Sequence, residues 1–78
     1  MIKVRVMAPF GFGKKVLDER YWMELHDNAK LSDLLRIIKM PQLLARAFFV
    51  SVNGAHIKND TCLQDGDSVS FFPVAHGG

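Results

Sequence analysis

Apolar and polar side chains alternate along four stretches of the chain, as they do in strands that bury one face. These stretches are residues 2–7, 21–25, 48–52 and 68–72. Asn53-Gly54 directly follows the third stretch and is the strongest hairpin signal in the sequence, so we expect a short return strand at 55–58. The pattern therefore predicts five strands.

A different spacing marks one helix between the second and third strands. Its apolar side chains recur at i, i+3, i+4 and i+7, in the order Leu31, Leu34, Leu35 and Ile38. We expect an amphipathic helix over residues 31–40, which Pro41 ends because proline cannot continue a helix. Lys30 occupies the N-cap position unless Ser32 takes that role, and one further helical turn is expected at 42–46.

The order of these elements indicates an α+β domain with one main helix packed on one face of a single sheet. The helical connection between the second and third strands fits a mixed sheet whose first and last strands lie parallel at its centre. This is the β-grasp, or ubiquitin-like, arrangement; periodicity predicts the elements, and the strand order follows by analogy. We expect the domain to cover residues 1–73 and a flexible tail ending in Gly-Gly to cover residues 74–78.

Composition narrows the classes of function. The single cysteine, Cys62, excludes an internal disulfide and any metal site built from cysteines, including that of plant-type iron–sulfur ferredoxins. The three histidines fit no zinc-binding spacing, so we expect no metal. The net charge of +2 is mild and the basic residues are scattered, which argues against nucleic acid as a partner. No apolar run approaches the roughly 20 residues of a membrane span, and the chain begins directly with a strand pattern, so we expect a cytoplasmic protein.

The side chains that could carry chemistry have simpler structural interpretations. Gly11-Phe12-Gly13-Lys14 lacks the spacing of a phosphate-binding loop, so we interpret it as a flexible loop between strands. Asp65 and Asp67 flank a turn glycine and are interpreted as turn formers. Cys62 lies in a predicted loop without a neighbouring base, which favours a structural or incidental thiol over a reactive one.

Several large apolar side chains fall on the strand face opposite the predicted core. They are Met7, Trp22, Phe49 and Phe72. Together they would form an apolar patch of the kind that marks a partner surface, and the alternative is ordinary scatter of apolar residues over a protein surface.

The printed chain ends in Gly77-Gly78, which is a poor ending for stability because glycine loses the most conformational entropy when it is ordered. A segment without side chains can thread a narrow channel in another protein and present its terminal carboxylate there. This hypothesis moves the search for chemistry to the main-chain carboxylate of Gly78. The alternative is a frayed end.

Three segments resemble the ubiquitin-like sulfur carriers of the MoaD/ThiS group. They are Val52-Asn53-Gly54, Leu63-Gln64-Asp65-Gly66-Asp67-Ser68-Val69 and Phe71-Phe72-Pro73-Val74-Ala75-His76-Gly77-Gly78. The resemblance covers the whole chain, and Phe71-Phe72-Pro73 is more similar to the small subunit of molybdopterin synthase than to the thiamine carrier. The chain departs from the molybdopterin type in its first loop, residues 8–15, which lacks an Arg-Glu-rich segment, and at His76, where a small residue is common.

The resemblance implies a specific chemistry at the end of the chain. A ubiquitin-activating-like enzyme would use ATP to adenylate the Gly78 carboxylate, and a sulfur donor would displace AMP to leave a thiocarboxylate. Ala75, His76 and Gly77 would thread the partner's channel. Met7, His56 and Phe72 would dock the adenylating enzyme and the large subunit of molybdopterin synthase, with His56 standing where a more apolar residue is expected. The chain would be a carrier and a small non-catalytic subunit that binds no cofactor, since the catalytic side chains come from its partners.

Other functions remain open on the sequence. The same chemistry could serve thiamine, a sulfur amino acid or transfer-RNA thiolation through another acceptor enzyme. A ubiquitin-like protein modifier or a plain interaction module is the alternative from a different class.

Overall fold

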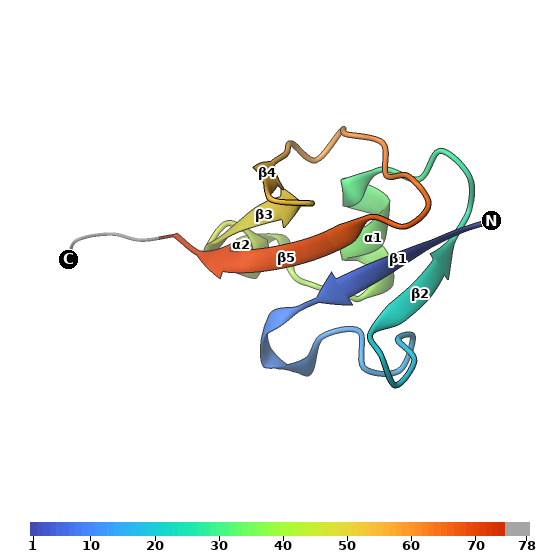
Figure 1. Ribbon diagram of the computed structural model, residues 1–78. Helices are drawn as coiled ribbons and strands as arrows, with labels where there is room; N and C mark the ends of the chain where they lie inside the picture. The colour runs from blue at the N-terminus through green and yellow to red at the C-terminus, as the bar shows by residue number, and fades with distance from the viewer. Residues whose placement is uncertain (75–78) are drawn as a thin grey trace.

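The computed structural model describes residues 1–74, and it has one mixed sheet with the main helix on one face (Figure 1). The strands are β1 (Ile2–Met7), β2 (Trp22–Leu25), β3 (Phe48–Val52), β4 (Ala55–His56) and β5 (Ser68–Pro73). The helices are α1 (Leu31–Ile37), α2 (Gln42–Ala45) and a 3-10 turn, η1 (Pro9–Gly11). All five predicted strands, the main helix and the extra helical turn are therefore present.

The sheet has the strand order β2-β1-β5-β3-β4. β1 and β5 pair in parallel at its centre, and the other neighbours are antiparallel. This confirms the predicted β-grasp arrangement, in which α1 crosses from the β1–β2 hairpin to β3 (Figure 1). The parallel pairing makes β5 the central strand that leads toward the end of the chain.

The core lies between the sheet and α1. It takes alternate residues of the strands and the apolar stripe of the helix, together with residues that flank them. Its fully buried side chains include Val4, Val6, Leu25, Leu31, Leu34 and Val69. Because strand side chains alternate between faces, the burial of Val4 and Val6 directs Lys3, Arg5 and Met7 to the opposite face of the sheet.

Helix α1 ends at Ile37, earlier than predicted, and Pro41 is not what stops it. Lys39 adopts a left-handed conformation with φ 61°, and the Met40 N–H donates to the Leu35 carbonyl over 3.1 Å. The Lys39 N–H donates to the Arg36 carbonyl over 3.0 Å, which completes a Schellman motif. This motif satisfies carbonyl groups at the end of α1 before the chain reaches the proline.

The other end of α1 is stabilised without a capping side chain at the N-cap position. Lys30 holds that position, and its own N–H donates to the Asp33 carboxylate over 2.9 Å. Arg36 donates to the same carboxylate over 3.0 Å. The Lys30 N–H, followed by Arg36, lowers the pKa of Asp33, while desolvation opposes the shift.

Turn residues tie the hairpin of β3 and β4 to the start of β5. Asn53 and Gly54 have φ 53° and 88°, as the two central residues of a type I′ turn require. The Asn53 side chain donates to Asp67 and accepts from the Ser68 N–H, each over 2.9 Å. Asp65 accepts from the Lys3 N–H over 2.8 Å, so the interpretation of Asp65 and Asp67 as turn formers is confirmed. The return strand is shorter than predicted, because β4 ends at His56.

Candidate functional site

The register of four strands brings the predicted docking residues onto one face. Residues paired across neighbouring strands project to the same side of a sheet. Met7 pairs with Ser70, Ser70 with Ser51, and Ser51 with His56, so these four residues form one row from β1 to β4. We call the sheet surface opposite α1 the outer face.

The next row on the outer face contains Phe72 opposite Phe49. The exposed fractions are 46% for Met7, 44% for Phe49 and 54% for Phe72. The His56 ring meets the Phe49 ring edge to face, with centroids 5.0 Å apart. Met7, His56 and Phe72 therefore belong to one surface, and Phe49 adds to it, as the apolar pattern predicted.

Trp22 also lies on the outer face but in a different neighbourhood. It pairs with Arg5, which in turn pairs with Ser68, and its side chain is half-buried. This row is displaced toward the start of β5, whereas Phe72 lies near its end. The most exposed part of this patch is consequently at the end of the sheet where β5 ends.

The predicted tail residues Ala75, His76, Gly77 and Gly78 lie outside the described residues. The last described residue is Val74, whose N–H donates to the Ala47 carbonyl over 2.8 Å. Pairing with the segment before β3 thus extends one residue beyond β5 and includes the first residue of the predicted tail. Val74 is thus held against the domain, two residues after Phe72.

The loop after β1 contains a feature that the sequence analysis missed. Phe10 lies in η1 with φ 55°, a left-handed conformation that costs a bulky residue about 1–3 kcal/mol. Its side chain is 80% exposed, although its ring meets the edge of Phe48 with centroids 6.1 Å apart. Glycines on both sides of Phe12 signalled a turn, but no local pattern indicated where the Phe10 ring would lie.

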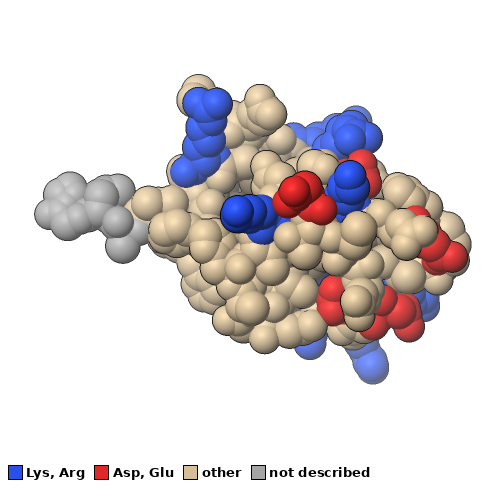
Figure 2. Space-filling model, turned by 90° about the horizontal axis from the view of Figure 1, so that it is seen from above, with Lys and Arg blue, Asp and Glu red and all other residues tan. Residues whose placement is uncertain are grey.

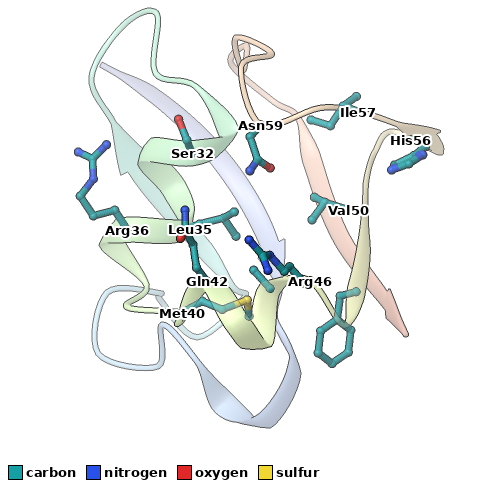
Figure 3. A pocket seen from close by; sticks show the side chains of 12 residues that line it. Ser32, Leu35, Arg36, Met40, Gln42, Arg46, Val50, His56, Ile57 and Asn59 are labelled. Carbon is teal, nitrogen blue, oxygen red and sulfur yellow. The ribbon is translucent and has the colours of Figure 1, made fainter. Parts of the chain in front are cut away.

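A groove of about 610 Å³ lies on the helix side of the sheet, between α1, α2 and the hairpin of β3 and β4 (Figure 3). Leu35, Met40 and Val50 contribute an apolar floor. Arg46 lies beside Gln42 and between it and Val50, whereas Arg36 points away and binds Asp33 (Figure 3). Sequence reasoning missed this groove because its lining comes from four separate elements, α1, α2, β3 and β4.

Among the described residues, the charged side chains do not cluster in a way that suggests a catalytic site. Acidic and basic residues are interspersed on the face shown in Figure 2. Among residues 1–74, no three His, Cys, Asp or Glu side chains gather in a way that could hold a metal ion. Cys62 is exposed and forms a backbone bridge with Lys30. No helix among residues 1–74 has the length and apolar character needed to cross a membrane.

Comparison with known proteins adds independent information. The model of the ThiS family matches residues 16–78, which includes the last residue of the printed chain. No curated protein sequence gives a significant match.

Two solved structures superpose on nearly the whole chain. One is described as a molybdopterin converting factor, subunit 1, from Pyrococcus furiosus; it has a TM-score of 0.61 and 26% sequence identity, and the match covers 92% of this chain and 94% of that one. The other is SAMP1 from Haloferax volcanii, with a TM-score of 0.61, 20% identity and coverage of 99% and 98%. The second likeness bears on the fold alone, and both agree with the β-grasp arrangement.

Proposed function

The chain belongs to the ThiS family of ubiquitin-like sulfur carriers, and we propose that it donates its sulfur in the synthesis of molybdopterin for a molybdenum or tungsten cofactor. Carriers of this family bear a C-terminal thiocarboxylate, and the family implies a ubiquitin-activating-like adenylating enzyme as a partner. In this chain the carboxylate would be that of Gly78, the last residue that the family model matches.

The reaction begins with activation of a weak electrophile. The negative charge of the Gly78 carboxylate is delocalised over both oxygens, so sulfur does not attack it. The partner joins the carboxylate to the AMP part of ATP and releases pyrophosphate, which places a good leaving group on the carbonyl carbon. Hydrosulfide then forms a C–S bond as the C–O bond to AMP breaks, and a thiocarboxylate results. Division into two displacements lowers the barrier of each, as in covalent catalysis generally.

The placement of the outer face beside Val74 is the observation that carries this proposal. Met7, His56 and Phe72 share one surface, and Phe72 lies on β5, two residues before Val74. An enzyme that binds this surface is held close to the segment that ends at Gly78. Such positioning converts attack on the terminal carboxylate into an effectively unimolecular step.

Two observations support molybdopterin as the product that receives the sulfur. The Pyrococcus furiosus structure that carries the description of molybdopterin converting factor is 26% identical over almost the full chain. The strand before the tail ends in Phe71-Phe72-Pro73, which resembles the small subunit of molybdopterin synthase. The large subunit of that synthase would then supply the catalytic side chains, and the carrier would supply the nucleophilic sulfur.

The first test is the intact mass of the purified chain after incubation with its adenylating enzyme, ATP, Mg²⁺ and sulfide. Replacement of oxygen by sulfur raises the mass by about 16 Da, and fragmentation should place the change at Gly78. The same chain lacking Gly78 is the control and should keep its mass. An unchanged mass in the complete mixture would contradict the carrier proposal.

A second assay separates the acceptors. The thiocarboxylate form is mixed with the large subunit of molybdopterin synthase and the cyclic pterin precursor, and in parallel with a thiazole synthase and its substrates. We expect molybdopterin to form in the first mixture and no thiazole in the second. The reverse result would keep the carrier function and reject its assignment to molybdopterin.

A further inference from the structure

The short distance between Val74 and Gly78 restricts how an enzyme can approach the reactive carboxylate. Four residues follow Val74, and a fully extended chain spans at most about 3.6 Å per residue, or about 14 Å in all. An enzyme that holds the Gly78 carboxylate beside ATP therefore comes within this distance of Val74. Both faces of the sheet at this end of β5 then lie close to the enzyme. This step rests on the function proposed above.

Phe10 lies at this end of the molecule, on the helix side of the sheet. Its ring meets the edge of Phe48, and the Phe48 ring meets the edge of Phe71 with centroids 6.5 Å apart. Phe48 also pairs with Pro73, the last residue of β5. The Phe10 ring is thus connected through one half-buried aromatic side chain to the strand that ends beside Val74.

The loop holds Phe10 outward rather than leaving it frayed. Ala8, Phe12 and Leu17 are partly buried and pack against the core, so the loop is anchored before and after Phe10. The Phe12 N–H donates to the Pro9 carbonyl over 3.1 Å, which closes the turn. Phe10 is thus a bulky residue in a left-handed conformation, anchored on both sides and 80% exposed. These features are those of a side chain held in place to contact a partner.

The outer face is continuous with this loop. Met7, the last outer-face residue of β1, also lines a hollow of about 420 Å³ with Gly11, Phe12 and Tyr21, at which the charged Lys14 and Asp18 lie as well. Apolar residues therefore continue from Met7, past the end of β1, to Gly11 and Phe12 beside Phe10. A partner that covers Met7 can thus extend to the first loop through this hollow.

We propose that Phe10 forms a second docking element for the adenylating enzyme, on the side of the sheet opposite Phe72. The enzyme grips the end of β5 from both faces: Met7, Phe49 and Phe72 meet it on the outer face, and Phe10 meets it on the helix side. Two contacts on opposite faces fix the direction in which the chain leaves the domain. One contact would leave the domain free to tilt about it, so Phe10 strengthens binding by adding a second point of attachment.

The test compares Phe10→Asn with Val16→Asn. Asparagine tolerates the left-handed conformation, so the first variant removes the ring and keeps the turn. Val16 is 44% exposed but lines a different hollow, with Lys3 and Glu24, which pair near the start of β1 and away from Met7. Each carrier is titrated in ATP–pyrophosphate exchange with the purified adenylating enzyme from the same organism, and its urea unfolding midpoint is measured.

We expect Phe10→Asn to raise the KM for the carrier about tenfold, as loss of an aromatic contact at an interface does, with kcat nearly unchanged. Val16→Asn should leave both constants at their wild-type values, and Phe10→Leu should restore most of the lost affinity. The unfolding midpoint of Phe10→Asn should not fall, which distinguishes lost docking from lost folding.

Two results would overturn this inference and leave the proposed function intact. In the first, Phe72→Asn raises KM while Phe10→Asn does not. In the second, Phe10→Asn breaks up a dimer of the free carrier in sedimentation without changing KM, which assigns Phe10 to a second copy of the chain. Absence of any exchange with the wild-type carrier would instead reject the proposed function itself.

Discussion

Gly13 joins the first loop to the end of α1, and its replacement by alanine tests how closely the two segments approach. Gly13 has φ +80°, and a Cβ atom there would lie 2.8 Å from Ile38 Cγ2 and 3.2 Å from Ile38 Cβ. Ile38 is 2% exposed and cannot turn away freely. A methyl group at this position is therefore disfavoured for two reasons: the left-handed backbone conformation and the close contact with Ile38.

The magnitude follows from these two terms. A left-handed conformation costs an alanine roughly 1–2 kcal/mol relative to glycine. Overpacking a well-filled site adds about 1–3 kcal/mol. We expect Gly13→Ala to lower the free energy of unfolding by about 2–5 kcal/mol, a large part of the total of about 4–12 kcal/mol expected for a chain of this length.

Gly11→Ala is the matched control. Gly11 belongs to the same loop and has φ +75°, but a Cβ atom there would meet nothing within 4 Å. It should cost only the conformational part, about 1–2 kcal/mol. Urea unfolding followed by Trp22 fluorescence measures both variants, and unchanged m-values would show that the denatured state is the same.

The contact itself can be isolated with a double-mutant cycle. Ile38→Leu removes the Cγ2 methyl group at a cost below about 1.5 kcal/mol. Gly13→Ala should therefore be less destabilising in the Ile38→Leu background than alone. Equal losses for Gly11→Ala and Gly13→Ala, or zero coupling with Ile38, would refute the close approach of loop and helix.

Three further predictions concern the docking face, the tail and the start of α1. Phe72→Asp should weaken binding to the adenylating enzyme about a hundredfold, because covering the 54% of a roughly 200 Å² side chain that is exposed is worth about 2.7 kcal/mol; unaltered affinity in calorimetry would remove Phe72 from the interface. Gly78→Ala should abolish thiocarboxylate formation in the mass assay and leave the thermal midpoint unchanged, whereas a large loss of stability would argue for a structural role. Asp33→Asn should lower the thermal midpoint at pH 7. The pKa of Asp33 is depressed below 3.8 in the folded state, so its contribution is present above that value and disappears as pH falls through the depressed pKa; a difference that persists in strong acid would contradict this.

The alternation of apolar and polar residues predicted part of the docking face but not all of it. Alternation along β1 and β5 was enough to assign Met7 and Phe72 to the face opposite the core, and the register confirms it. The pattern could not tell that His56, on a two-residue strand, would share a row with Met7. That row depends on three strand pairings: the local Asn53-Gly54 hairpin places His56 opposite Ser51, and two pairings between distant parts of the chain place Ser51 and Met7 beside Ser70.

The end of α1 shows that a sequence pattern can also fail to predict a local feature. The apolar stripe predicted the helix and its buried face, but Pro41 was wrongly taken as its stop signal. The chain turns at Lys39, where no glycine announces a left-handed residue. Ile38 at this turn lies close to Gly13 of the first loop, a contact that no local pattern indicated.

By itself, then, the sequence determined which segments are strands and helix, which side chains face the core, and where the Asn53-Gly54 and Asp65-Gly66-Asp67 turns lie. The strand and helix patterns repeat every two to four residues, and each turn is marked by adjacent residues, so neighbouring positions suffice to specify them. Only the tertiary structure decided the placement of Phe10 on Phe48 and the gathering of Met7 and His56 in one row. These depend on pairing between segments far apart in the chain, where packing against the shared core selects one arrangement among many that the local pattern would permit.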